Sequence, residues 1–408
     1  MLSFVAAKPL EFSPAGAPLA VSTPAHFVRA SFGGRLLRSA LLGVGLLTAA
    51  RSETGLPAPN DIDPTPAHPR NTEGAYVTLH SGRILFSYSQ FSDGQHDHSP
   101  SAIAEVYSDD QGRTWSQPRV VVPTGSYQNI MSVSFLRLVS GKIARFHCVK
   151  RTKWLDCHPV MSTSTDEGFT WSEPKQVLEA PGYFVLNNDR IIQTSSGRII
   201  VPLAFHRSKT MTDDESAFDA RAIDVWYYSD DEGATWKESK SWWGIPVASG
   251  SGLQEPGAVE LADGSLYGWS RTDQGFQYEF RSNDNGLTWS APQPTKLSSP
   301  TSPASIKRLP GSSALMVIYN DHSGRVPAPA KANQRSPLVA SFSTDGAKTW
   351  GPPQLIEDDL TGWYCYTAIH FTDDAVLLAY VAGNDQIGHL SRLRLRRIPF
   401  TALHLPQH

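Results

Sequence analysis

Glu255 and Arg271 stand at the ends of two strand-like runs that are joined by an Asp-Gly turn at residues 263–264. A carboxylate and a guanidinium placed in this way could hold and activate a charged substrate. An ionic pair in a cleft is otherwise costly to bury, so we interpret both residues as functional. The alternative interpretation is a polar strand end beside a solvated arginine.

Asp97 lies in a second segment of interest, the loop at residues 95–101, between His96 and His98. Two nearby histidines suggest a metal site, but neighbouring loop residues are rarely ligands without a third partner. We therefore predict no metal and no cofactor, and we regard both histidines as ordinary loop residues.

The remaining candidates are aromatic and basic residues in the last quarter of the chain. Tyr366 and Tyr364 lie two residues apart, which places them on one face of a regular strand. Aromatic strand residues usually belong to the core, so a structural role stays open for both. Arg335 and Arg325 are isolated arginines, a kind of residue that usually lies at the surface.

An internal repeat indicates which elements must position these residues. An octet with the pattern S-x-D-x-G-x-T-W occurs five times, and its first serines are 53 to 65 residues apart. The copies begin at Ser108, Ser164, Ser229, Ser282 and Ser343. In the last copy, Ala347 replaces the glycine. Aspartate accepts hydrogen bonds from turn amides and glycine takes a positive φ, so the octet predicts a hairpin turn.

A period of this length fits one four-stranded blade with loop insertions. Five marked blades and an unmarked region at 363–400 predict an all-β, six-bladed β-propeller over residues 70–400, followed by a tail at 401–408. We expect the last blade to close with a strand from the region after Arg70. A propeller brings loops from distant parts of the chain to one axis, so the candidate residues can share a pocket.

The octet is the Asp-box, and its fivefold recurrence between about residues 70 and 400 resembles the sialidase superfamily. In that family the boxes lie at the blade periphery, away from the active site. The resemblance therefore implies structural roles for Asp110, Asp166, Asp231, Asp284 and Asp345. Non-enzymatic propellers also carry Asp-boxes, so the repeat speaks more strongly for the fold than for an activity.

The segment 253–271 resembles a sialidase segment in which a glutamate opens an inner strand and an arginine ends the next one. The resemblance implies that Glu255 is the base that activates a tyrosine and that Arg271 binds a substrate carboxylate. It implies Tyr366 as the activated tyrosine, with Tyr364 as the alternative.

Two further roles are implied by the same resemblance. Sialidases carry their acid/base aspartate in a mobile loop shortly before the first Asp-box, where Asp97 is the first candidate and Asp93 the second. Arg335, eight residues before the fifth box, resembles the third arginine of the sialidase triad, and Arg325 is a weaker competitor.

The first arginine of that triad departs from the family pattern. Sialidases place it in an Arg-Ile-Pro motif, whereas here Arg70 falls about two residues early and lacks the following Ile-Pro. A shift of two keeps a side chain on the same strand face. The departure brings Glu73 close to the expected site. The segment 187–190 opens another inner-strand candidate that could supply substrate contacts.

The reaction implied by the resemblance is retaining hydrolysis of a terminal α-ketosidic bond to sialic acid or a related nonulosonic acid, within acidic-sugar glycans. Sialidases that use tyrosine are exceptions to the usual two-carboxylate scheme of glycosidases. The carboxylate on the anomeric carbon would repel a carboxylate nucleophile, whereas a neutral tyrosine is not repelled if Glu255 removes its proton. Arginines 70, 271 and 335 would hold the substrate carboxylate.

Two other functions stay open at this point. A non-catalytic propeller that binds glycans or protein partners is supported by the displaced first arginine. A glycosidase for neutral sugars would need a carboxylate pair and no arginine cluster.

Bulk properties set the remaining expectations. The formal net charge of −3 over 408 residues gives no indication of a nucleic-acid or membrane-surface partner. The three cysteines, Cys148, Cys157 and Cys365, form neither a disulfide framework nor a zinc-finger spacing. Cys148 and Cys157 flank a predicted hairpin turn, so one disulfide or two buried thiols are both open.

The first seventy residues differ from the rest. Arg35 and Arg38 precede a short apolar run at 40–50 that ends in small residues, which is typical of a signal peptide and too short for a membrane span. We predict a signal peptide within residues 28–51, with residues 1–51 also holding a misassigned extension and 52–69 forming a linker. The protein is then secreted or periplasmic.

Overall fold

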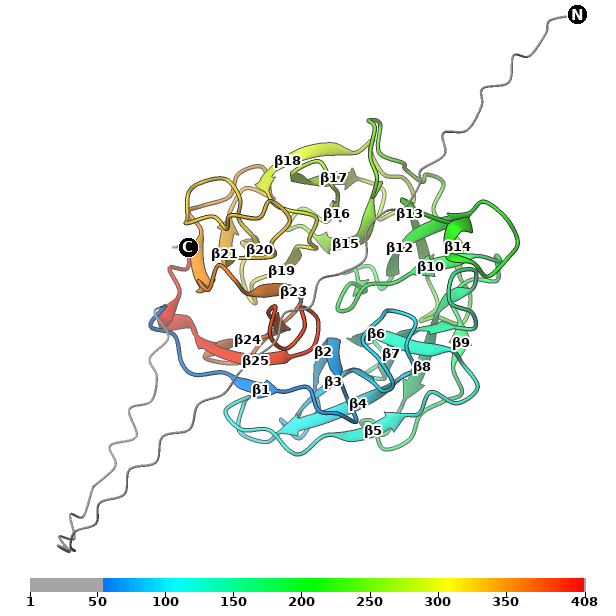
Figure 1. The fold of residues 1–408 in the computed structure, drawn as a ribbon, viewed down its shortest axis with the longest axis horizontal. Coiled ribbons are helices and arrows are strands. Elements are labelled where there is room, and N and C mark those ends of the chain that lie inside the picture. Colours follow the sequence, from blue (N-terminus) through cyan, green and yellow to red (C-terminus); the bar gives the residue numbers. More distant parts are fainter. Residues whose placement is uncertain (1–53, 407–408) are drawn as a thin grey trace, which may run out of the picture. The chain divides into compact units, whose positions relative to one another are not determined.

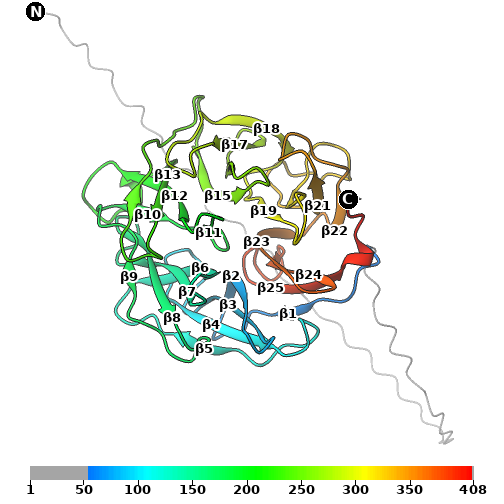
Figure 2. The same cartoon turned by 180° about the vertical axis from the view of Figure 1, so that it is seen from behind.

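The computed structural model describes residues 54–406, and this part of the chain folds into 25 β-strands and two short 3-10 helices. The strands form six blades around a common axis, as the all-β prediction requires (Figure 1). Strands β2, β6, β15, β19 and β23 lie nearest the centre in both views (Figure 2). No helix among the described residues is long and apolar enough to cross a membrane. The predicted signal peptide lies outside the described residues.

The first three blades follow one another along the chain. The first contains β2 (Arg70–Thr78), β3 (Ile84–Phe91), β4 (Ser101–Ser108) and β5 (Arg119–Val122). The second contains β6 (Asn129–Arg137), β7 (Ile143–Lys150), β8 (Cys157–Ser164) and β9 (Lys175–Gln176). The third contains a divided inner strand, β10 (Tyr183–Val185) and β11 (Ile192–Gln193), then β12 (Ile199–Ser208), β13 (Phe218–Ser229) and β14 (Lys237–Glu238). A short parallel pairing of β10 with β8 joins the second and third blades into one sheet.

The last three blades complete the ring. The fourth contains β15 (Gln254–Glu260), β16 (Leu266–Arg271), β17 (Phe276–Ser282) and β18 (Gln293–Ser298). The fifth contains β19 (Ser305–Arg308), β20 (Leu315–Asn320), β21 (Leu338–Ser343) and β22 (Gln354–Glu357). The sixth contains β23 (Trp363–Phe371), β24 (Ala375–Gly383), β25 (Leu393–Pro399) and β1 (Asn60–Ile62). The helices are η1 (Glu215–Ala217) and η2 (Phe400–Ala402).

The strand that closes the ring is not the one we expected. The sixth blade takes its outer strand from β1, before Arg70 and inside the segment predicted as a linker, and not from the region after Arg70. Asp61 of β1 accepts two hydrogen bonds from Arg394 of β25, both at 2.8 Å. Arg70 instead begins the inner strand of the first blade. The first and last strands of the propeller, β1 and β25, therefore pair at the outer edge of the sixth blade and not at the axis.

The Asp-boxes form the turns between the third and fourth strands of the first five blades. In the first box, Asp110 accepts hydrogen bonds from the backbone N–H and the hydroxyl of Thr114, at 2.9 and 2.6 Å. The Ser108 hydroxyl donates to the same carboxylate and accepts from the N–H of Gly112. The other four boxes repeat the threonine and serine contacts of the aspartate. The prediction that these aspartates are structural is confirmed.

The three cysteines are buried thiols. Cys148, Cys157 and Cys365 are free and fully buried, so the disulfide that the sequence left open is not formed. Cys148 and Cys157 belong to β7 and β8 of the second blade and pack in its hydrophobic core. Beyond the last blade, Leu403 is buried, so part of the predicted tail also packs against the propeller.

Candidate functional site

A repeated backbone irregularity directs side chains toward the axis. In β2, β6, β15 and β23, the register with the neighbouring strand shifts at a residue with positive φ, as in a β-bulge. These residues are Glu73, Ser132, Glu255 and Tyr366, with φ between 51° and 64°. Asp189 has the same conformation in the gap between β10 and β11. Left-handed backbone is unfavourable for residues other than glycine, and its presence at five inner positions marks the axis as a candidate functional region.

Small residues beside two of these bulges permit the close packing that fixes them. A Cβ on Gly74, next to Glu73, would lie 2.3 Å from the ring of Phe86. A Cβ on Gly257, two residues after Glu255, would lie 2.2 Å from the indole of Trp269. Aromatic rings of the second strand thus press directly on the inner strand and hold both carboxyl-bearing bulges in place.

The bulges surround a cavity of about 320 Å³. Four of the six predicted site residues line it: Asp97, Glu255, Arg271 and Tyr366. Aromatic and imidazole side chains form another part of the lining: His96, His98, Trp154, Tyr183, His206 and Phe218. Among the described residues, no group of three or more His, Cys, Asp or Glu side chains could hold a metal ion.

Glu255 and Tyr366 contact each other across the cavity, although 111 residues separate them. The hydroxyl of Tyr366 donates a hydrogen bond to Oε1 of Glu255 at 3.1 Å. Burial raises the pKa of Tyr366 and the charge of Glu255 adds to that rise, while Arg335 and Arg271 oppose it. The phenol therefore stays protonated in the ligand-free site, with a carboxylate placed to take its proton.

Arg271 lies on the other side of the same carboxylate. Its Nη1 is 3.0 Å from Oε1 and 2.9 Å from Oε2 of Glu255. Its Nη2 donates to the amide oxygen of Gln254, and both members of the Arg271–Glu255 pair are about one-eighth exposed. The strand pairing explains the geometry, because Arg271 at the end of β16 stands opposite Gln254 at the start of β15.

Arg335 approaches the tyrosine from the fifth blade. Its guanidinium carbon lies 5.5 Å from the ring centre of Tyr366 and 5.4 Å from that of Trp363. Its Nε and Nη1 are buried without a hydrogen-bond partner. A buried cation with free donors is the arrangement that an incoming anion would complete.

The weaker alternatives lie away from this cluster. Tyr364 is packed in the core against Tyr380, because the bulge at Tyr366 breaks the two-residue alternation that we had assumed. Arg325 instead donates to the hydroxyl of Tyr319 at 2.8 Å. Asp93 is exposed and does not line the cavity.

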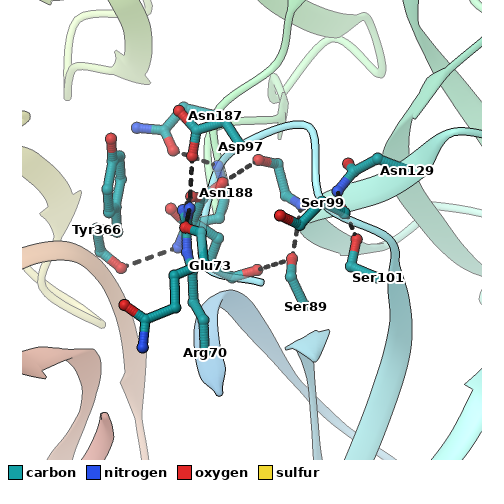
Figure 3. Close-up of polar contacts among 12 residues, drawn as sticks. Arg70, Glu73, Ser89, Asp97, Ser99, Ser101, Asn129, Asn187, Asn188 and Tyr366 are labelled. Atoms are coloured by element: carbon teal, nitrogen blue, oxygen red, sulfur yellow. Dashed lines mark hydrogen bonds and ion pairs between the residues drawn. The ribbon is translucent and has the colours of Figure 1, made fainter. Parts of the chain in front are cut away.

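Arg70 lies next to the cavity, but its guanidinium is already bound to two acidic side chains. Its Nη1 donates to Asp97 at 2.6 Å and to the backbone oxygen of Gln95 at 3.0 Å. Its Nη2 donates to Glu73 at 3.2 Å. Figure 3 shows the guanidinium of Arg70 extending toward Asp97, with Glu73 beside it. The side chain of Arg70 is only 1% exposed, so it reaches the cavity through these carboxyl groups.

The two carboxyl groups on Arg70 differ in proton affinity. Enclosure opposes ionisation of Asp97, but the charges of Arg70, Lys150 and Arg271 outweigh it and lower the pKa of Asp97. Burial dominates at Glu73 and raises its pKa to about 7, although Arg70 and a hydrogen bond from Ser132 act in the opposite direction. Near neutral pH, Asp97 is therefore ionised, while Glu73 is partly protonated.

The segment 187–190 holds inner strands together. The side-chain amide of Asn188 donates to the backbone oxygens of Gly74 and Tyr366, at 2.8 and 3.1 Å (Figure 3). Asp189 accepts from Lys307 at 2.7 Å, and buried Arg190 donates to the fifth blade at Ser305 and at the backbone of Ala304. Only Asn187 of this segment lines the cavity.

Sequence reasoning missed Lys150 and the aromatic part of the lining. Lys150 ends β7 and donates to the backbone oxygen of Asp97 at 2.6 Å, which ties down the loop at 95–101. His98 packs against Trp154, which in turn packs against Phe218, at ring distances of 5.2 and 5.4 Å. These contacts join residues of three blades, and no local pattern in the sequence signals them.

Comparisons with known proteins agree with this geometry. The profile of the BNR repeat-like domain family matches residues 106–378. A sialidase of Micromonospora viridifaciens is 26% identical over 329 residues, which cover 72% of this chain and 47% of the relative. The chain thus spans about half the length of the curated relative it matches.

Solved structures show the same fold. The NanB sialidase from Streptococcus pneumoniae superimposes with a TM-score of 0.64 at 17% identity, over 85% of this chain and 71% of that one. The intramolecular trans-sialidase from Ruminococcus gnavus gives a TM-score of 0.63 at 16% identity, over 83% and 96%. A protein of unknown function from Dyadobacter fermentans gives 0.64 at 17% identity, over 84% of this chain and all of that one.

Proposed function

The chain belongs to the BNR repeat-like domain family of the sialidase superfamily, and from this premise we propose that it is a retaining exo-sialidase-like glycoside hydrolase. Its substrates are glycans that end in sialic acid or a related nonulosonic acid, and the protein acts after export. The contact between the Tyr366 hydroxyl and Glu255 at 3.1 Å carries the proposal.

Tyr366 is the proposed nucleophile. As its oxygen attacks the anomeric carbon, its proton passes to Glu255, which already accepts its hydrogen bond. A neutral phenol can approach a carbon that bears a carboxylate, and the raised pKa of Tyr366 keeps the phenol neutral until the attack. The positive φ of Tyr366 points the ring out of the strand alternation and toward the axis.

The arginines are the proposed carboxylate site. Arg335 offers free N–H groups beside Tyr366, and Arg271 holds Glu255 in position while it faces the cavity. Arg70 completes the set when the substrate carboxylate replaces one of its own acidic partners. Guanidinium groups suit this task because they bind carboxylates with paired, directional hydrogen bonds.

Asp97 is the proposed acid/base residue for the leaving oxygen and for the incoming water. Arg70 keeps it ionised in the ligand-free protein, since the pKa of Asp97 is lowered by the neighbouring positive charges. When the substrate carboxylate takes over Arg70, Asp97 loses that partner and its proton affinity rises.

A fluorogenic sialoside assay tests the proposal. The wild type should release the fluorophore, and both Tyr366→Phe and Glu255→Gln should lose at least about a thousandfold in kcat. Tyr364→Phe is the matched control, because it removes a phenol hydroxyl from the core two residues away. A wild type that is inert toward several acidic sugars yet binds them would favour a glycan-binding propeller instead.

A further inference from the structure

A substrate anion that approaches Arg70 meets two carboxyl groups that are already bound to this arginine. Its two terminal nitrogens donate to Asp97, Gln95 and Glu73, and the face of its guanidinium lies 4.4 Å from the ring centre of Phe91. A carboxylate that enters the cavity would be repelled by the charges of Asp97 and Glu73 and would compete with them for Arg70.

Glu73 is the partner that is held rigidly. It is 4% exposed, its φ of 51° fixes it in the β2 bulge, and the hydroxyl of Ser132 donates to its Oε2. It lines the cavity alongside Glu255 and Tyr366. The side chain of Asp97 is 66% exposed and that of Glu73 only 5%, so Glu73 has less room to move aside for a ligand.

The ionisable groups around Glu73 come from several blades. They are Arg70 on its own strand, Asp97 on the β3–β4 loop, Cys148 on β7, Glu255 on β15, and Cys365 and Tyr366 on β23. Arg70 is the cation among them, and Asp97 and Glu255 are carboxyl groups. An added substrate carboxylate would raise the proton affinity of Glu73 further, because a nearby negative charge disfavours its ionised form.

We propose that Glu73 makes binding of an acidic sugar proton-linked: the side chain takes up a proton and so releases Arg70 to the substrate carboxylate. This role rests on the proposed function and adds a specificity determinant to it. A protonated Glu73 no longer competes as an anion, and its O–H becomes a donor that faces the ligand. A neutral sugar brings no charge and would gain nothing from the proton.

The direction of the pH dependence follows from the pKa of Glu73, which is raised to about 7 in the free protein. Below that value Glu73 already carries its proton, so an anion binds without proton uptake. Above it, each binding event must first draw a proton from solution. The affinity for an acidic sugar then falls by about tenfold per pH unit.

Isothermal titration calorimetry with 2-deoxy-2,3-didehydro-N-acetylneuraminic acid, an unsaturated sialic acid analogue, tests the proposal. Titrations in MES and Bis-Tris at pH 6, and in HEPES and Tris at pH 8, count the protons through the difference in buffer ionisation heat. The wild type should take up close to one proton per ligand at pH 8 and few at pH 6. Its affinity should weaken by about tenfold between those pH values.

Variants identify the group that takes up the proton. Glu73→Gln should bind without proton uptake and with equal affinity at both pH values, while Asp97→Asn should keep the uptake. Glu105→Gln is the matched control, because Glu105 is also a buried carboxyl of the first blade that contacts one serine, Ser87, and one arginine, Arg119. It should behave as the wild type.

The outcomes separate the two proposals. A wild type that binds the analogue without proton uptake overturns the role of Glu73 and leaves the proposed function standing. Uptake that survives in Glu73→Gln and disappears in Asp97→Asn assigns the proton to the loop aspartate instead. A wild type that binds no acidic sugar overturns both proposals together. The proton count on the wild type decides the matter even if Glu73→Gln does not fold.

Discussion

The rim and the axis of this propeller use the same backbone conformation for different ends. At the rim, each Asp-box turn contains a residue with positive φ directly before the glycine or alanine at the fifth position of the octet, such as Gln111 or Glu232. At the axis, Glu73, Glu255 and Tyr366 take nearly the same φ within inner strands. Rim turns repeat in both sequence and geometry, whereas axis bulges repeat in geometry alone.

This difference separates a structural repeat from a functional one. The rim aspartates all satisfy turn amides and hydroxyls of their own octet, so one residue pattern serves every blade. The axis bulges point two carboxyl groups, a hydroxyl and a phenol into one cavity. Two of these four blades supply a carboxyl group, one supplies a hydroxyl and one a phenol, because all four side chains serve one shared cavity.

Among the substitutions that compare the axis with the rim, we expect the largest effect from Arg335→Gln at the axis. Two of its nitrogens lack partners, so the substitution removes donors that only a ligand uses. We expect kcat/KM for an acidic sugar to fall by about 10²–10³-fold, as when a single charge-stabilising donor is lost. The melting temperature checks that the variant keeps its fold, because the guanidinium of Arg335 also packs against the rings of Trp363 and Tyr366. Arg325→Gln, on the same β20–β21 connection, is the control and should retain full activity.

Much of the rim could be predicted from the sequence, and the reason is local. Each Asp-box satisfies its hydrogen bonds within eight residues, so the octet determines its own turn wherever it occurs. The closing strand β1 could not be predicted, because it has only three residues and depends on Arg394, more than 300 residues away. Short strands of this kind carry no periodicity that a sequence reader can use.

At the axis, resemblance identified most of the site residues, but the sequence did not reveal the bulges that orient their side chains. Glu255, Arg271, Arg335 and Tyr366 were all placed by resemblance, and the structure brings them together. Glu73 was noticed only as a neighbour of the displaced Arg70, since its positive φ is not signalled by a glycine. Strand alternation also failed at Tyr364, because the bulge at Tyr366 reverses which face each residue occupies.

The two regions should respond to pH in opposite directions. Hydrogen bonds from the octet hold the pKa of Asp231 down, at about 2, so its stabilising contribution is present above its unfolded value near 3.8 and is lost as the pH falls toward 2. Burial raises the pKa of Glu73 from 4.5 to about 7, so its contribution is lost as the pH rises across that interval.

Urea unfolding across pH 2–8 checks both signs. The wild type should lose stability relative to Asp231→Asn below pH 4, and relative to Glu73→Gln between pH 4.5 and 7. Parallel curves for the wild type and Glu73→Gln over the second interval would show that the axis carboxyl is ionised in the folded protein as it is in the unfolded chain.

Asp231→Ala should weaken the rim and spare the axis. The carboxylate accepts from the N–H and hydroxyl of Thr235 and from Ser229, at 2.5 to 2.8 Å. Losing these bonds at an exposed turn should cost about 1–2 kcal/mol of unfolding free energy in urea titrations. Turnover per folded molecule should not change. Asp230→Ala is the neighbouring control: it breaks only a partly exposed ion pair with Arg198, worth less than about 1 kcal/mol.

The smallest expected effect is Gln111→Gly, which tests whether positive φ is merely tolerated at the rim. The fifth octet already has Gly346 at this position. Relief of left-handed strain is worth about 1–2 kcal/mol, and the greater freedom of glycine in the unfolded chain costs about 0.5–1 kcal/mol. A net gain of about 0.5 kcal/mol should appear as a slightly higher urea midpoint with unchanged activity. A loss of stability would mean that the contact of Gln111 with Asp373 at 3.3 Å outweighs the strain.

At the axis, Ser132→Gly relieves the same strain but deletes the donor to Glu73, so there the pH profile of binding should move even if stability rises.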